Sequence, residues 1–159
     1  MNLKNTPRIA LIALAAAGMM FAGCAKKEVV SNESQAPQQS VQPVKAKAAM
    51  PSSNSVYFAF DSSTLDAAGK ATLDAYAAYL NDHADVAIIL EGNCDERGSR
   101  EYNLALGQRR ADSVRDYLNG QGVDASRVDT VSFGEERPVC TGSGEACWAQ
   151  NRRADIVSR

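Results

Sequence analysis

Apolar residues in the second half of this chain recur with two spacings, one typical of strands and one typical of helices. Short runs rich in β-branched and aromatic residues predict strands, because such side chains pack well on a pleated surface. Apolar and small residues three or four positions apart predict helices with one buried face. The predicted strands cover residues 56–60, 86–91, 128–133 and 153–157. The predicted helices cover residues 65–81, 99–120 and, as a short element, 145–151.

These elements follow one another as strand, helix, strand, helix, strand, short helix and strand. Such alternation predicts an α/β (α+β) domain of two layers, in which a small mixed sheet carries its helices on one side. The domain is expected to span residues 55–159. A domain of about one hundred residues can bury one adequate hydrophobic core.

The loop between the second strand and the long helix concentrates the charge of this domain. It contains Asp95, Glu96 and Arg97, followed by Gly98 and Ser99. Gly98 suits a positive φ angle, and the Ser99 hydroxyl can cap the helix that follows. Helical spacing predicts a buried face made of Leu104, Gly107, Ala111, Val114 and Leu118, with Asn103 and Arg110 at its edge.

Arg110 is therefore expected to be half buried, where an unpaired guanidinium would be costly. Asp95 is a candidate partner for it. One interpretation is a structural ion pair or two solvated charges. The other is that both groups face a common space and bind a ligand that carries an ammonium and a carboxylate, since an aspartate suits the first and an arginine fork suits the second.

Residues 1–23 have the pattern of a targeting signal. Lys4 and Arg8 precede an apolar stretch, residues 9–20, that is too short to span a membrane. Small residues then precede Cys24, which resembles a bacterial lipobox and predicts cleavage before Cys24 and attachment of lipid to its sulfur. The alternative is an ordinary signal peptide with a chance cysteine, because Phe21 stands where leucine is usual.

Residues 24–54 are expected to be the lipidated N-terminus and a flexible tether. Beyond Cys24 the segment has no aromatic residue, and it is rich in Gln, Ser, Ala and Pro. Such a segment cannot bury enough apolar surface to offset the entropy lost on ordering.

Residues in and after the charged loop carry a family resemblance: Asp95, Asn103, Leu106, Arg110, Ala111 and Val114. They resemble the signature of the OmpA-like peptidoglycan-binding domain. The longer strings NCDERGSREYNLALGQRRADSV and FGEERPVC…ACWAQNRR are similar to the lipid-anchored branch of that family. Cys94 and Gly107 stand where many relatives have Thr and Ser. The resemblance covers residues 55–159 and implies the same fold.

The resemblance also implies a ligand site for diaminopimelate, an amino acid of peptidoglycan stem peptides. Asp95 would accept from its ammonium group, Arg110 would hold its carboxylate, Arg97 would add a second positive contact and Leu106 would pack on its methylenes. Phe60 and Asp61 would line the cleft, and Tyr102 and Asn103 would shape it. Judged as structure alone, Phe60 would be a core aromatic and Asp61 a turn former.

The partners implied are peptidoglycan, the outer membrane through the N-terminal lipid, and the Tol system, chiefly its periplasmic β-propeller protein TolB. The expected role is to link the outer membrane to the cell wall in the Tol-Pal system, which serves envelope integrity and cell division. A wall-binding lipoprotein outside the Tol system is the alternative, followed by a murein hydrolase. A motor stator of the same family would need a spanning helix.

The expected state of each cysteine follows from the periplasmic location that the resemblance implies. With Cys24 assigned to lipid, Cys140 and Cys147 are expected to form a disulfide in the oxidising periplasm, and Cys94 to remain a buried free thiol. The alternative is that all three are reduced.

Several other functions are not expected from this sequence. The formal net charge is −2, without a basic excess, so nucleic acid is not an expected partner. Three cysteines with His83 as the only histidine do not predict a metal site. No Ser–His or Cys–His signature and no clear acid/base pair of carboxylates is present. We therefore expect a binding protein and not an enzyme, with no cofactor.

Overall fold

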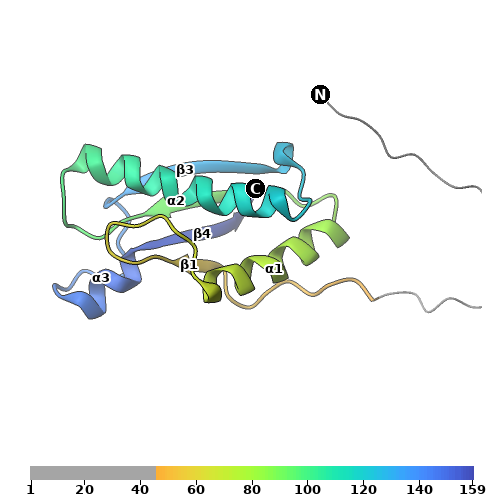
Figure 1. Cartoon of the computed structure of the whole chain (residues 1–159), viewed down its shortest axis with the longest axis horizontal. Coiled ribbons are helices and arrows are strands. Elements are labelled where there is room, and N and C mark those ends of the chain that lie inside the picture. Colours follow the sequence, from red (N-terminus) through yellow and green to blue (C-terminus); the bar gives the residue numbers. More distant parts are fainter. Residues whose placement is uncertain (1–45) are drawn as a thin grey trace, which may run out of the picture. The chain divides into compact units, whose positions relative to one another are not determined.

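The computed structural model describes residues 46–159 (Figure 1). The predicted signal segment 1–23, Cys24 and the first part of the predicted tether lie outside the described residues. The last part of the predicted tether, residues 46–54, contacts the domain at two points. The Ala48 N–H donates to the Asp82 carboxylate at 2.8 Å, and the Asn54 carbonyl accepts from the Ile156 N–H at 2.7 Å.

The order of the elements is the one that the hydrophobic pattern predicts, with a single 3-10 turn, η1, added before the third strand. Their bounds are β1 (Ser55–Tyr57), α1 (Ala67–Asp82), β2 (Ile88–Asn93), α2 (Arg100–Gly120), η1 (Ala125–Arg127), β3 (Val128–Gly134), α3 (Glu145–Asn151) and β4 (Arg153–Ser158). Asp66 caps α1, since its carboxylate accepts from the Gly69 N–H at 2.7 Å. No helix within residues 46–159 is both long and apolar enough to cross a membrane.

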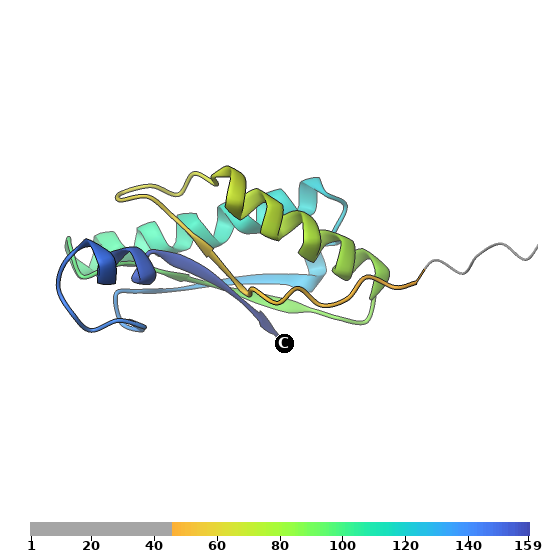
Figure 2. The ribbon, with the colours of Figure 1, turned by 90° about the horizontal axis from the view of Figure 1, so that it is seen from below.

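The four strands form one mixed sheet in the order β1-β4-β2-β3. β4 is antiparallel to both of its neighbours, whereas β2 and β3 are parallel. Figure 2 shows α1 and α2 on the same face of this sheet. The predicted two-layer α/β (α+β) fold is therefore confirmed.

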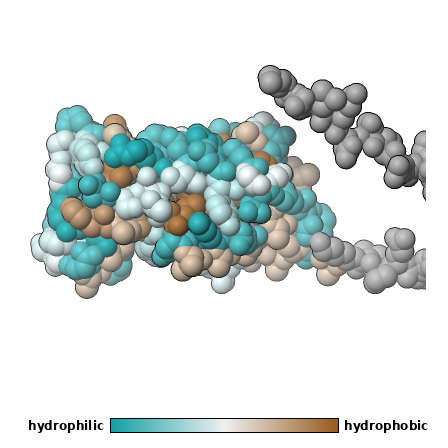
Figure 3. Space-filling view, viewed as in Figure 1, coloured by the Kyte–Doolittle hydropathy of each residue, from teal (hydrophilic) through white to brown (hydrophobic). Residues whose placement is uncertain are grey.

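The hydrophobic core lies between the two long helices and the covered face of the sheet. Its fully buried members include Leu73, Tyr76 and Leu80 of α1, Ala111, Val114 and Leu118 of α2, and Leu90 and Ala154 of the sheet. Burial of one leucine contributes about 1.5–3 kcal/mol, so these contacts fix the position of α2 over β2. The face drawn in Figure 3 is mostly hydrophilic or neutral, with small separate apolar patches.

Two glycines let α2 lie directly on β2. A Cβ atom on Gly92 would stand 1.9 Å from the Gly107 carbonyl oxygen, and one on Gly107 would stand 2.3 Å from Ser132 Oγ. Any larger residue would push the helix away from the strand. The contact brings the N-terminal half of α2 against the end of β2, where the charged loop begins.

The predicted buried face of α2 is wrong in part. Leu104 is 49% exposed, whereas Leu106 is buried and Asn103 and Arg110, expected at the edge of the face, are buried completely. The buried face of α2 is thus rotated around the helix from the predicted one, so that it includes the polar residues Asn103 and Arg110. This is possible because both polar side chains find hydrogen-bond partners in neighbouring loops.

Candidate functional site

A cavity of about 170 Å³ lies between the end of β2, the first turns of α2 and the loop that connects β1 to α1. Its lining comprises Phe60, Asp61, Cys94, Asp95, Arg97, Gly98, Tyr102, Asn103, Leu106 and Arg110. Every residue to which the sequence assigns a ligand-binding or site-shaping role is in this set. The fold thus brings together residues that are up to fifty positions apart in the chain.

The charged loop is held in place from both ends. Gly98 has φ 116°, and the Ser99 hydroxyl accepts from the Tyr102 N–H at 3.2 Å at the start of α2. The Asn103 side chain donates to the Asp95 carbonyl oxygen at 3.2 Å and to the Glu135 carboxylate at 2.5 Å. The predicted roles of Gly98 and Ser99 are confirmed, and buried Asn103 ties the loop to the helix.

Arg110 is the largest fully buried side chain of the described domain. Its Nε donates to the Ser62 carbonyl at 2.8 Å, Nη1 donates to the Asn93 carbonyl at 2.8 Å, and Nη2 donates to the Ala59 carbonyl at 3.2 Å. Nη1 also lies 3.3 Å from the sulfur of Cys94. Burial lowers the pKa of Arg110, but an arginine remains charged at neutral pH.

Of the two interpretations of Asp95 and Arg110, the structural ion pair is therefore wrong. Three carbonyl groups from two segments converge on Arg110, and their dipoles stabilise its charge in place of a carboxylate. Among the contacts of the described chain, four of the five guanidinium N–H groups have a partner, which leaves one N–H on Nη2. Both residues nevertheless line the same cavity.

Asp95 is also buried, with 4% of its surface exposed. Its carboxylate accepts from the N–H and Nε of Arg97, both at 3.1 Å, and from Arg97 Nη2 at 2.7 Å. Arg152 Nη1 adds a contact at 3.3 Å. Burial acts to raise the pKa of Asp95, but the hydrogen bonds from Arg97 and Arg152 outweigh it, so the pKa lies below its ordinary value. Asp95 is an anion at neutral pH.

Arg97 lies between two aromatic rings. Its guanidinium carbon is 4.0 Å from the centre of the Phe60 ring and 4.1 Å from that of Trp148. Phe60 is 58% exposed, so its assignment as a core aromatic is wrong. The reason is that β1 ends at Tyr57 and not at Phe60, after which the chain turns toward the cavity and Asp61 adopts φ 51°.

Two lining residues of the cavity are joined by a contact between two elements. The Tyr102 hydroxyl on α2 donates to the Asp61 carboxylate of the β1–α1 loop. This hydrogen bond is the main reason why the pKa of Tyr102 is raised. Asp61 is thus a turn residue, as expected from structure alone, and also a lining residue of the cavity.

The sequence predictions missed three residues next to the site. Arg152 contacts both Asp95 and Glu145, and Trp148 packs on Arg97 and donates to Glu96 at 3.0 Å. All three belong to α3 or to the residue that follows it. A signal was present for Arg152, since two consecutive arginines at the start of a buried strand need anionic or carbonyl partners.

The structure contains the Cys140–Cys147 disulfide, and Cys94 is a buried free thiol. Burial is the main cause that raises the pKa of Cys94, so this thiol stays protonated at neutral pH. Among residues 46–159, no group of three or more His, Cys, Asp or Glu side chains is placed to hold a metal ion.

The arrangement suits a small zwitterion. A buried carboxylate and two guanidinium groups face one cavity, and Leu106 supplies an apolar wall. A ligand with an ammonium, a carboxylate and a short aliphatic chain would match these three features.

Known proteins share this fold and much of this sequence. Residues 57–154 match the sequence profile of the OmpA family. The peptidoglycan-associated lipoprotein of Haemophilus influenzae is 54% identical over 104 residues, which cover 65% of this chain and 68% of that protein. That of Mesorhizobium japonicum is 42% identical over 160 residues, which cover 95% of this chain and 90% of that protein.

Solved structures of OmpA-like domains have the same fold as this chain. The crystal structure of the peptidoglycan-associated lipoprotein from Burkholderia pseudomallei has a TM-score of 0.66 at 50% identity and covers 67% of this chain and 91% of that chain. The C-terminal domain of Helicobacter pylori MotB has a TM-score of 0.61 at 18% identity and covers 65% and 81%, which concerns the fold alone. The chain belongs to the OmpA family, and within that family it is similar to the peptidoglycan-associated lipoproteins.

Proposed function

We propose that this protein is an outer-membrane lipoprotein that binds peptidoglycan without covalent chemistry. It would recognise the diaminopimelate-containing stem peptides and so link the outer membrane to the cell wall. The observation that carries the proposal is the cavity whose lining includes the opposite charges of buried Asp95 and buried Arg110 together with apolar Leu106. The relatives are named peptidoglycan-associated lipoproteins, which supports peptidoglycan as the polymer that is bound.

The contacts and the exposure of Asp95 and Arg97 indicate how such a ligand would enter. The two oxygens of Asp95 already accept four hydrogen bonds, three of them from Arg97, which is about the capacity of a carboxylate. Arg97 is 31% exposed, whereas Asp95 and Arg110 are buried. The ligand ammonium would therefore replace Arg97 on Asp95, and the freed guanidinium would turn to the ligand carboxylate.

Arg110 would supply the fixed cation. Its remaining Nη2–H can donate to a ligand carboxylate, while the other N–H groups keep the guanidinium in place. Charge-assisted hydrogen bonds contribute about 1.5–3 kcal/mol each, so one stem peptide would bind with modest affinity. The many stem peptides of one polymer would raise the avidity of the intact wall.

The site supports binding and not catalysis. Its thiol, Cys94, is kept protonated by burial and donates to the Asn103 carbonyl at 3.2 Å. Its two carboxylates are engaged, that of Asp95 by Arg97 and Arg152 and that of Asp61 by Tyr102. A protonated thiol without a neighbouring base is a poor nucleophile. We therefore propose that the protein is not a murein hydrolase.

The anchoring and the partners extend the proposal to the rest of the chain. Lipid on Cys24 would hold the N-terminus in the periplasmic leaflet of the outer membrane, and residues 24–54 would allow the domain to reach the wall. By family resemblance, the domain would also bind TolB and act with the Tol system in envelope integrity and cell division. A Cys24→Ser variant is expected to lose its partitioning into detergent; unchanged partitioning would contradict lipidation.

The site is tested by sedimentation with purified sacculi. Asp95→Asn keeps the shape of the side chain but removes its charge, and it should lower the affinity about tenfold or more. Asp116→Asn is the matched control, because Asp116 is exposed on α2 away from the cavity. Equal sedimentation of the two variants would refute the site, and release of muropeptides by the wild-type protein would favour a hydrolase.

Soluble stem peptides test the ligand itself. A peptide that ends in diaminopimelate carries an ammonium and a carboxylate at the far end of its side chain, whereas the lysine analogue carries the ammonium alone. The diaminopimelate peptide should bind at least tenfold more tightly, since only it can engage both Asp95 and an arginine. Equal affinities would rule out recognition of a zwitterion.

A further inference from the structure

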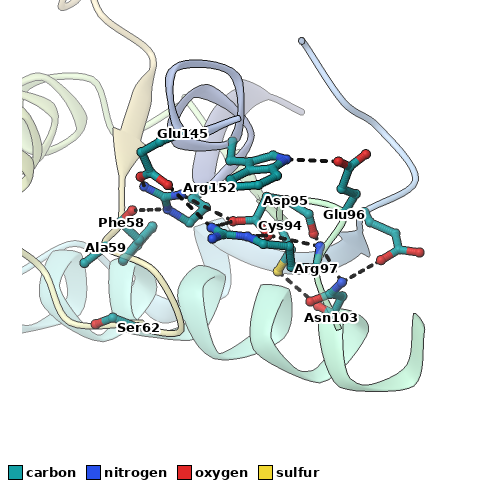
Figure 4. A network of polar contacts seen from close by, with 12 residues as sticks. Phe58, Ala59, Ser62, Cys94, Asp95, Glu96, Arg97, Asn103, Glu145 and Arg152 are labelled. Carbon is teal, nitrogen blue, oxygen red and sulfur yellow. Dashed lines mark hydrogen bonds and ion pairs between the residues drawn. The ribbon is translucent and has the colours of Figure 1, made fainter. Parts of the chain in front are cut away.

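A second layer of side chains supports the charged loop from the side of α3 (Figure 4). We define residues 140–152, which comprise the disulfide-closed loop, α3 and Arg152, as the α3 clamp. Its residues contact Asp95, Glu96 and Arg97, so three consecutive residues of the loop are held by one short segment. No residue of this segment lines the cavity itself.

Arg152 is the first contact of the clamp. It is buried, and its Nη1 lies 3.3 Å from the Asp95 carboxylate. Its Nη2 donates to Glu145, and its Nε donates to the Phe58 carbonyl at 3.0 Å. Arg152 is therefore fixed by three partners, and it contacts Asp95 Oδ2, the same oxygen that accepts from Arg97 Nη2. Figure 4 shows Arg152 between Glu145 and Asp95.

Trp148 is the second contact. One face of its ring packs against the guanidinium of Arg97 at 4.1 Å, and its Nε1 donates to Glu96 at 3.0 Å. Glu145 lies 3.7 Å from Arg97 Nη2. Arg97 is thus held in a slot between Phe60 and Trp148, which fixes the plane of its guanidinium while leaving it partly exposed.

The α3 clamp is held together by a disulfide and by hydrogen bonds within the segment. α3 has seven residues and no side-chain cap, which is too short for a helix to be stable alone. The Cys140–Cys147 disulfide ties the first turn of α3 to the preceding loop. Asn151, at the other end, accepts from the Val139 and Cys140 N–H groups at 2.9 and 3.0 Å and donates to the Cys140 carbonyl at 2.7 Å.

We propose that Trp148 and Arg152 are positioning residues for the ligand site, and that the Cys140–Cys147 disulfide sets its affinity by holding them in place. The proposal rests on the proposed function. Arg152 keeps the Asp95 carboxylate in one orientation when the ligand ammonium displaces Arg97. Trp148 keeps the displaced guanidinium in its slot, from which it reaches the ligand carboxylate. Opening the disulfide loosens both contacts without touching a residue that lines the cavity.

The test is a titration of the full-length protein with a soluble stem peptide that ends in diaminopimelate. Trp148→Ala removes the ring contact and should weaken binding about threefold to tenfold, whereas Trp148→Phe keeps an aromatic face on Arg97 and should restore most of the affinity. Gln150→Ala is the matched control, since Gln150 is exposed on the same helix and bonds only within it. Wild-type affinity in a folded Trp148→Ala variant would overturn the proposal.

The disulfide is tested in the same assay. The double variant Cys140→Ala/Cys147→Ala, and the wild-type protein treated with a phosphine reductant, should both lose affinity by a similar factor, with the far-UV circular dichroism and the thermal midpoint of the domain largely kept. Unchanged affinity would refute the role of the disulfide. Loss of the fold in either sample would also refute it, because the bridge would then hold the whole domain and not the site.

Tryptophan fluorescence gives a signal that should respond to the ligand only if Trp148 lies next to the ligand site. Trp148 is the only tryptophan of the chain, and its ring contacts the cation that the ligand displaces. Binding should shift its emission, and reduction of the disulfide should shrink that shift. If the wild-type protein binds the ligand without a change in the emission spectrum of Trp148, the assigned position of Trp148 is wrong. Absence of any binding by the wild-type protein would instead reject the proposed function itself.

Discussion

Arg110 is expected to be as important for folding as for binding. The substitution Arg110→Ala removes the donor that joins the carbonyl groups of Ala59 and Ser62 to that of Asn93. These carbonyls come from the β1–α1 loop and the end of β2, so one side chain holds two segments against α2. Its loss leaves all three carbonyls without this donor, and that of Asn93 belongs to a buried residue. It also leaves a cavity in the space of the side chain.

The magnitude follows from these contacts. An unsatisfied buried acceptor costs about 1–3 kcal/mol. This cost applies in full to the Asn93 carbonyl and less to those of Ser62 and Ala59, which belong to a half-buried and an exposed residue. The variant no longer buries a charge, which offsets part of this cost. Removal of one partner from a buried, hydrogen-bonded charge typically destabilises a protein by about 3–5 kcal/mol, and we expect a value in this range. That is a large part of a total stability of about 5–15 kcal/mol.

The assay is equilibrium unfolding in urea, followed by far-UV circular dichroism. The midpoint of Arg110→Ala should fall by roughly 2 M. Arg109→Ala is the matched control, because it makes the same change at the neighbouring exposed position of α2 and should alter stability by less than about 0.5 kcal/mol. If the two variants unfold at the same urea concentration, the reasoning about Arg110 is wrong.

Three further predictions concern other parts of the site and of the helix. Gly107→Ala should destabilise the domain by about 1–3 kcal/mol, because its Cβ would meet Ser132 Oγ at 2.3 Å, whereas Gly120→Ala meets nothing within 4 Å and should be neutral or stabilising in the same urea assay. The pKa of Asp95 is lowered by folding, so its contribution to stability is complete above about pH 4 and is lost as the pH falls through the lower folded pKa; Asp95→Asn should lose less stability than the wild-type protein between pH 5 and pH 2. Cys94 is buried and its pKa is raised, so alkylation of the Cys94 peptide, followed by mass spectrometry, should be slow in the folded protein and fast in urea; equal rates would contradict its burial.

The element order could be predicted from sequence because periodicity is a local property. The start of α2 is an example, since Ser99 and Gly98 act within one turn of the chain. The end of β1 could not be predicted in this way. Residues 56–60 have a strand-like composition, but the strand ends at Tyr57 because the chain must turn toward α2, and Asp61 takes a positive φ angle there.

The partners of the site charges are non-local, which is why the sequence could not decide between a direct ion pair of Asp95 with Arg110 and a shared cavity. Arg110 bonds to carbonyls 48 and 51 positions away, and backbone acceptors leave no trace in a sequence. Arg152 lies 57 positions from Asp95, so no spacing rule connects the two. Asp95 and Arg110 could be assigned to one cavity from the family resemblance, but their hydrogen bonds required the structure.

The two arginines that face the cavity have different physical roles. Arg110 is held by carbonyl groups on three sides, so it adds a cation at a fixed position and loses almost no freedom when a ligand arrives. Arg97 bonds to Asp95, the group to which the proposed ligand ammonium would bind, so in the proposed complex Arg97 would have to move between the rings of Phe60 and Trp148. Selectivity for a carboxylate should therefore depend mainly on Arg110. The rate of ligand entry should depend mainly on how firmly Phe60 and Trp148 hold Arg97.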